Sequence, residues 1–343
     1  MLINFITKNR IPSSRILSCL LISLTSALAL GADNPHQFKA DPTKVLGRET
    51  CVECHEPMVN AWETTHHFLS FQAGFGGKPP MHRSDEAKSI LKKMDLRSAK
   101  RGECVVCHYT GQASASGRVK TISGTSCESC HGGAKDWNKV HSDVKNNPNA
   151  LIEAQALGMI RPDQTYAVGA NCFECHTVPN EKLVNTGGHT AGSAFELLAW
   201  SQGEVRHNLQ ASEGKENTIA SVERQLEMFV LGKVLDLEYG LRGLAQSKEE
   251  GIYYKSMTDR INEAQTLVSS LADKSANSAL KKIAGLVQSG ELKPNNEAKL
   301  LEVANAIRKE GLALQESGAL QKLDSLKSEL PAVSDYHGKP YQP

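Results

Sequence analysis

Eight cysteines of the chain occur in four copies of one short motif. The copies are Cys51-Val-Glu-Cys54-His55, Cys104-Val-Val-Cys107-His108, Cys127-Glu-Ser-Cys130-His131 and Cys172-Phe-Glu-Cys175-His176. Each has the order Cys-x-x-Cys-His, which is the attachment sequence of a c-type haem. The two thiols join the porphyrin covalently, and the histidine that follows becomes the proximal ligand of the iron. The sequence therefore predicts four covalently bound haem c groups.

Three other uses of paired cysteines account for these motifs less well. A zinc site or a redox dithiol uses Cys-x-x-Cys, but neither requires the next residue to be histidine. A disulfide between cysteines three residues apart on a helix would be strained. Haem attachment alone explains why histidine follows all four pairs.

The second axial ligand decides what each haem can do. A haem with two histidine ligands is suited to moving electrons, whereas one with a vacant sixth position can bind a small molecule. Eight histidines lie outside the motifs, and four haems need at most four of them. We predict as distal ligands His67, His141, His189 and His207.

The first of these, His67, lies twelve residues after His55. Pro57 suits the first turn of a helix, so the sequence predicts a helix over 57–67. His67 would then lie about 18 Å along the helix axis from His55, too far to reach the same iron. We therefore expect His67 to serve another haem, with the adjacent His66 as its alternative.

The other three candidates are chosen from their local context. His141 follows the third motif by ten residues, and His207 lies near the end of a helix-like stretch at 193–205. His189 follows Gly187-Gly188 on a predicted loop, where backbone freedom would let it approach an iron. No ligand role is assigned to His36, His82 and His337.

The N-terminus has the pattern of a secretory signal. Three basic residues precede an uncharged apolar stretch at 16–30, so residues 1–32 are predicted to be a signal peptide removed on export to the periplasm. An uncleaved membrane anchor would need nearer to twenty apolar residues. The ninth cysteine, Cys19, lies within this segment and is assigned no role. No later segment is apolar enough to span a bilayer, so we expect no membrane span in the mature chain.

The overall charge excludes one class of function. The 343 residues contain 39 Lys and Arg against 38 Asp and Glu, and loss of the predicted signal would leave a mildly acidic chain. Nucleic-acid binding domains normally carry a strongly basic face, so no nucleic-acid partner is expected. Aromatic residues are only 5% of the chain, which is consistent with haems supplying part of the apolar interior.

The stretch 45–210 resembles the tetrahaem cytochrome c-554 family. The resemblance rests on the first motif followed by Trp62-x-x-Thr65-x-His67, and on the Thr-Ser that precedes and the Gly that follows the third motif. It implies stacked and offset haem pairs wrapped by short helices and loops, an electron-carrier role, and distal ligands at His67, His141 and His207. In that family the haem of the second motif can lack a sixth ligand. In this chain His189 offers a sixth ligand, so the sequence is compatible with either five or six ligands at this haem.

Beyond about residue 213 the composition changes to one typical of helices. Apolar residues recur every three or four positions from Val222 to Leu244, and again within 261–271, 280–287 and 300–314. We expect residues 213–334 to form an antiparallel helical bundle packed on the haem domain. A dimer interface or a partner-docking surface is the alternative. Residues 335–343 are expected to be a loose tail.

Together these patterns predict a mainly α protein with a tetrahaem domain at 33–212. Its predicted function is that of an exported cytochrome carrying single electrons between periplasmic or membrane redox partner proteins, without catalytic residues. The alternative is a haem enzyme that reduces a small nitrogen or oxygen species, such as nitric oxide or hydroxylamine, at one five-coordinate haem.

Overall fold

The structure is a computed structural model that describes residues 39–72 and 79–343. It is mainly helical, as predicted, with 57% helix. The predicted signal peptide at 1–32 lies outside the described residues, as does His36. None of the described helices has the length and apolar character needed to cross a bilayer.

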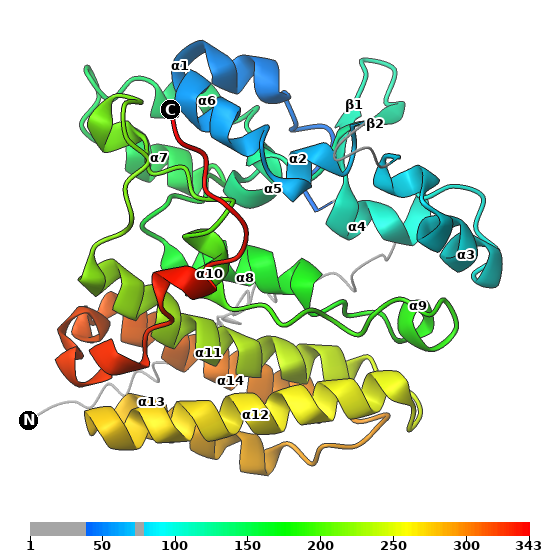
Figure 1. Ribbon diagram of the computed structural model, residues 1–343, viewed down its shortest axis with the longest axis vertical. Helices are drawn as coiled ribbons and strands as arrows, with labels where there is room; N and C mark the ends of the chain where they lie inside the picture. Colours follow the sequence, from blue (N-terminus) through cyan, green and yellow to red (C-terminus); the bar gives the residue numbers. More distant parts are fainter. Residues whose placement is uncertain (1–38, 73–78) are drawn as a thin grey trace, which may run out of the picture. The chain divides into compact units, whose positions relative to one another are not determined.

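The described helices and strands follow one another along the chain as shown in Figure 1. They are α1 (Arg48–Trp62), α2 (His66–Leu69), α3 (Asp85–Lys93), α4 (Val105–His108), β1 (Thr110–Ala113), β2 (Val119–Ser123), α5 (Cys127–His131), α6 (Asn138–His141), α7 (Ala150–Ala156), α8 (Thr165–His176), α9 (Glu181–Asn185), α10 (Leu197–Ser201), α11 (Val222–Ala245), α12 (Ile252–Ser275), α13 (Ser278–Leu286) and α14 (Glu297–Glu316). Strands β1 and β2 form an antiparallel hairpin between the second and third motifs.

The region that carries the motifs is built from short helices. The prediction of one helix over 57–67 is wrong, because α1 ends at Trp62 and α2 begins at His66. The hydroxyl of Thr65 explains the break: it donates to the Trp62 carbonyl and accepts from the Phe68 amide, and so caps α2. The helix-like stretch at 193–205 is likewise reduced to the five residues of α10.

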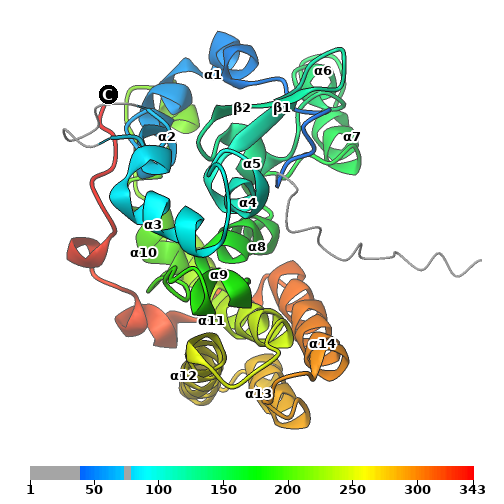
Figure 2. The same cartoon turned by 90° about the vertical axis from the view of Figure 1, so that its right-hand side faces the viewer.

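The C-terminal helices pack around α11. Figure 1 shows α12 running alongside α11, and Figure 2 shows α11 to α14 nearly end-on, grouped together. Helix α11 is buried along most of its length because α12 and α14 contact it on some sides and α8 and α10 on others. The apolar positions predicted from the 222–244 periodicity therefore form one continuous core from Leu226 onward, whereas Val222 is 40% exposed.

Helix α8, which ends in the fourth motif, packs directly on this core. A Cβ placed on Gly169 would lie 2.5 Å from a methyl group of Leu235, so a larger residue would force this side chain to move at the approach of α8 to α11. A Cβ on Gly311 of α14 would likewise clash with the ring of Tyr166. The glycines set how closely α8 lies against the C-terminal helices.

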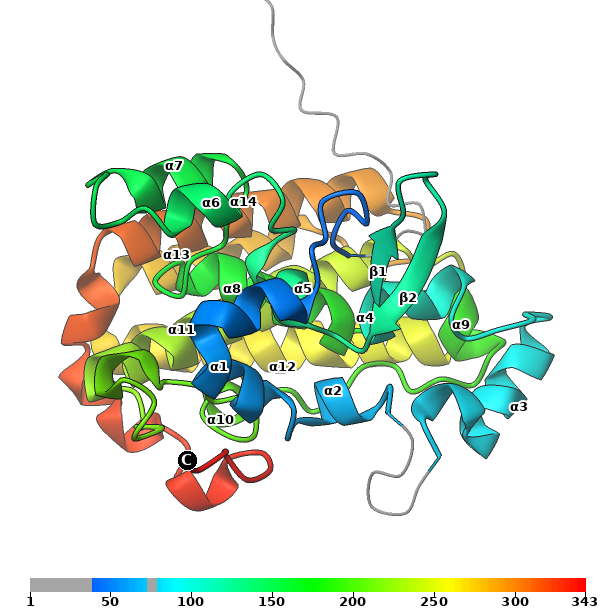
Figure 3. The same cartoon turned by 90° about the horizontal axis from the view of Figure 1, so that it is seen from above.

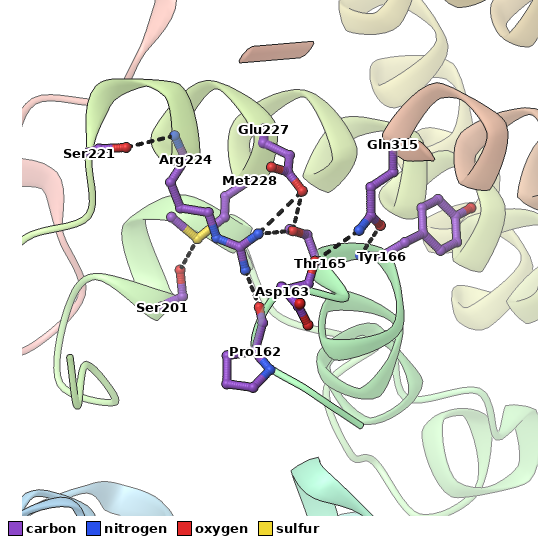
Figure 4. A network of polar contacts seen from close by, with 10 residues as sticks. All are labelled: Pro162, Asp163, Thr165, Tyr166, Ser201, Ser221, Arg224, Glu227, Met228 and Gln315. Atoms are coloured by element: carbon purple, nitrogen blue, oxygen red, sulfur yellow. Dashed lines mark hydrogen bonds and ion pairs between the residues drawn. The ribbon is translucent and has the colours of Figure 1, made fainter. Parts of the chain in front are cut away.

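Polar contacts fix the first turn of α8 in the same place, as Figure 4 shows. Arg224 of α11 donates to the Pro162 carbonyl and to the Thr165 hydroxyl, which in turn donates to Glu227. From α14, the Gln315 side chain accepts from the Tyr166 amide at 2.8 Å. The helix of the fourth motif is thus anchored to α11 and α14.

The C-terminal segment 335–343 is held by specific contacts, in contrast to the loose tail that the sequence predicts. The His337 ring stacks on Trp200 with centroids 3.7 Å apart and planes 7° apart. Its backbone pairs with the chain at Ala199 and Glu204, and the Asn217 amide donates to the Tyr341 carbonyl. This stacking and pairing replace the freedom expected of a terminus rich in Gly and Pro. Figure 3 shows the segment running past α10.

Candidate haem sites

Each motif histidine faces one other histidine across nearly the same distance. We number the sites one to four by the motif that supplies the first histidine. The ring centroids are 6.2 Å apart in site one and 6.3 Å apart in sites two, three and four. The pairs are His55 with His141, His108 with His189, His131 with His207, and His176 with His67.

This spacing fits one metal ion between two imidazoles. A bond from a metal to an imidazole nitrogen is about 2 Å, and the ring centre lies about 1.2 Å further on, so two rings on opposite sides of one metal have centroids roughly 6.3 Å apart. The angle between ring planes ranges from 22° in site one to 86° in site three, so the distance is shared while the ring orientation is not. The four sites therefore fit haem iron with two axial histidines.

The structure brings together all eight histidines predicted as ligands. Of the alternatives, His66 is exposed and its Nδ1 lies 2.5 Å from Glu204. His82 lies near Phe71, and His337 stacks on Trp200. His67 pairs with the histidine of the fourth motif, in keeping with the argument that it cannot reach the iron of His55.

Hydrogen bonds at Nδ1 orient five of the eight rings. Such a bond leaves Nε2 for a metal and fixes the ring plane. In site three, the Nδ1 of His131 lies 2.9 Å from the Ile160 carbonyl oxygen. The other partners of Nδ1 are the carbonyl oxygens of Asn138 for His141, Thr190 for His189 and Val205 for His207, and the hydroxyl of Ser193 for His176.

Burial favours the neutral form of four site histidines. Burial, together with neighbouring histidines, lowers the pKa of His108 and of His176 to about 4. Burial is also the main cause of the lowered pKa of His67 and His131. Only the neutral imidazole has a free lone pair for a metal, so these rings are ready to ligate at neutral pH.

The attachment cysteines place the sites in two pairs. None of the eight motif cysteines is in a disulfide. The thiol of Cys51 lies within hydrogen-bonding reach of Cys127, so site one adjoins site three. The thiols of Cys107 and Cys175 also lie within hydrogen-bonding reach of each other, so site two adjoins site four.

A hydrogen bond of Asn171 connects the two pairs, and the partly buried Lys39 holds the same helix. The amide of Asn171, on α8, donates to the Cys130 carbonyl at 2.8 Å and so ties the third motif to the helix of the fourth. The Lys39 ammonium donates to the Asn171 carbonyl at 2.8 Å and to the Glu174 carboxylate at 2.5 Å. Sites three and four therefore also adjoin.

One residue that positions sites one and three was not predicted from the sequence. Glu128, between the cysteines of the third motif, is buried, with only 2% of its surface exposed. Its carboxylate accepts from the amides of Leu46 and Gly47, both at 2.8 Å, just before α1. It also accepts from the Ala134 amide at 2.9 Å. A charged residue inside an attachment motif gives no signal of burial, because another such residue, Glu174 of the fourth motif, is half-exposed.

Comparison with known proteins finds similarity over part of the chain. Residues 50–132, which contain the first three motifs, match the family described as cytochrome c554 and c-prime. Over 171 residues the chain is 26% identical to cytochrome c-554 of Nitrosomonas europaea. This part of the chain is therefore similar to the cytochrome c-554 family. The similarity supports a c-type cytochrome with covalently bound haem c.

The likeness to this cytochrome c-554 is partial. It covers 47% of the present chain and 66% of the relative, so slightly less than two thirds of the relative's length is matched. No solved structure matches the chain.

Proposed function

We propose that this protein is an exported tetrahaem cytochrome that carries single electrons between redox partner proteins. The observation that carries the proposal is the set of four histidine pairs at 6.2–6.3 Å, each containing one motif histidine. Haem iron with two axial imidazoles supplies a one-electron centre with no open position for a substrate.

The chain contributes rigid placement of these centres. Hydrogen bonds at Nδ1 hold the rings at fixed angles, so ligand geometry changes little when the charge of the metal changes. The adjoining thiols support the order one, three, four, two for the sites. Electrons would then cross the protein in three short steps.

The C-terminal helices, in this proposal, are a scaffold for site four and not an oligomer interface. The fit of α8 against Leu235 and the contacts of Arg224 and Gln315 support this role. The proposed boundary between the haem domain and the helical extension remains near residue 212.

The reductase alternative is not favoured. It requires a haem without a sixth ligand. By the family resemblance, this would be the haem of His108. The ring of His189 lies 6.3 Å from His108, the same distance as in sites three and four. Site two is therefore proposed to be closed.

Spin-state spectroscopy of the purified protein tests the proposal. We expect four haems per chain, all low-spin, with no spectral change on adding nitric oxide or cyanide. Replacing His189→Ala should convert one haem of the four to a high-spin form that binds cyanide. The matched control His66→Ala, which removes a histidine outside the pairs, should leave all four low-spin. A high-spin haem in the unmodified protein would refute the closed site and favour the reductase.

A further inference from the structure

One segment of this chain is strongly basic. Residues 81–101, which include α3, contain seven Lys and Arg against three Asp and Glu. The whole chain, in contrast, carries a formal net charge of only +1. The positive charge is therefore concentrated in this basic segment.

The basic segment lies against site two. The Lys93 side chain lies so close to Gly188 that a Cβ there would be 2.7 Å from its Nζ. Gly188 precedes His189, the second histidine of the site. Ile90 and Met94 of this segment pack on Leu183 of α9, which leads into the same loop.

A second contact joins the segment to the other side of site two. The Lys100 ammonium lies 4.5 Å from the centre of the Phe71 ring. That ring meets the edge of Tyr109 at 6.0 Å, and Tyr109 directly follows His108. The basic segment thus flanks both histidines of the site.

Most of these positive charges have no acidic partner. Lys88 pairs with Asp85 at 2.8 Å. Among the described residues, no carboxylate forms an ion pair with the six others, and all except Lys100 are exposed. The six are Arg83, Lys92, Lys93, Arg97, Lys100 and Arg101. The two propionates of a single haem would neutralise about two of them, so a net positive surface remains.

The carboxylates near site four, in contrast, have partners. The Glu204 carboxylate lies beside α2, where it contacts His66 next to the site histidine His67. Glu174 lies between the cysteines of the fourth motif. Glu174 also pairs with the Lys39 ammonium at 2.5 Å, so the unpaired charge lies at site two, where it would attract an acidic partner.

We propose that the basic segment 81–101 is the docking surface for the acidic face of a redox protein that exchanges electrons at site two. This inference rests on the proposed electron-carrier function. In each encounter the partner loses one electron, which reduces one ferric iron to the ferrous state, and no atom or proton is transferred. Electrostatic attraction raises the association rate of such partners and weakens as salt screens it.

Stopped-flow reduction of the full haem-loaded protein by an acidic flavodoxin hydroquinone tests the proposal. The variant Lys92→Glu/Arg97→Glu reverses two exposed charges that contact neither histidine of site two. The matched control Lys281→Glu/Lys309→Glu makes the same change in net charge on α13 and α14. We expect the second-order rate constant at low salt to fall at least tenfold in the first variant and less than twofold in the control. The decrease of the rate with salt should disappear only in the first variant.

Two outcomes would overturn the proposal. One is an equal loss of rate in both double variants, which would reflect total charge alone. The other is an unchanged flavodoxin rate in the first variant together with lost binding to phosphatidylglycerol vesicles, which would assign the segment to a membrane surface. Visible spectra and dithionite reduction are recorded for every variant. Failure of the electron-carrier function itself would appear there, as missing or irreducible haem, before any partner is added.

Discussion

The haem-bearing region and the C-terminal helices reach a folded state by different means. Helices α2, α4, α5 and α6 have four or five residues each, and the small apolar clusters near them contain three buried residues apiece. Helices α11 and α12 have 24 residues each and share one large core. Isolated helices of one turn are unstable in water, so the first region depends on side-chain hydrogen bonds and on the groups that its histidines hold. The second region depends on its own apolar side chains.

Withholding haem should produce the largest difference between the two regions. We expect a chain with all eight motif cysteines replaced by Ala to lose ordered structure at 39–212, because the paired histidines would have no metal to join them. Residues 222–316 should stay helical. Hydrogen exchange followed by mass spectrometry measures both regions in one sample. Slow exchange of α4 and α5 in the haem-free chain would show that this region folds without its cofactor.

Truncating a core side chain should destabilise the C-terminal helices and leave the haem sites unchanged. Leu231 is fully buried on α11, and Leu231→Ala should lower the free energy of unfolding of the helical region by about 2–5 kcal/mol through lost burial and a new cavity. The low-spin spectrum in native buffer should not change. Leu267→Ala, at a position that is 46% exposed on α12, is the matched control and should cost far less. Denaturant unfolding followed by circular dichroism gives both values.

A smaller effect is expected from the carboxylate that joins sites one and three. Glu128→Gln keeps the size of the side chain but removes the charge from three hydrogen bonds with backbone amides. We expect a loss of about 1–3 kcal/mol in stability, with altered reduction potentials at sites one and three. The exposed Glu49→Gln is the control. Equal shifts at all four haems would contradict the local role of Glu128.

The same contrast explains which features the sequence predicted. The attachment motifs are local and chemically constrained, and the apolar spacing of 222–244 repeats over many turns, so both could be recognised. The pairing of His67 with His176, in contrast, depends on the interruption of the helix at Thr65 and on the close approach of two segments that are distant in the sequence. The sequence supplied the set of eight histidines but not which pairs they form. The burial of Glu128 and the contacts of His337 also depend on distant residues, and no local pattern marks them.

The two regions should also differ in their response to pH, with the smallest effect arising from single tyrosines of the helical core. Burial raises the pKa of Tyr253, whose hydroxyl donates to the Gly243 carbonyl at 2.8 Å. The unfolded chain loses this proton near pH 10, whereas the folded chain keeps it, so stability present below pH 10 is lost as the pH rises further. Tyr253→Phe should therefore flatten the alkaline loss of stability by about 1.4 kcal/mol per pH unit.

Urea unfolding between pH 9 and pH 11, followed by the circular dichroism of the helices, measures this slope. Phe229→Leu, which alters the same core without removing a titrating group, should keep the slope of the unmodified protein. An unchanged slope in Tyr253→Phe would mean that the hydroxyl reaches water before the helices unfold. In site two the sign is opposite, since the pKa of His108 is lowered to about 4 and the unfolded state binds the extra proton between pH 6.5 and pH 4. Acid should thus weaken the haem region through His108, whereas alkali should weaken the helical core through Tyr253.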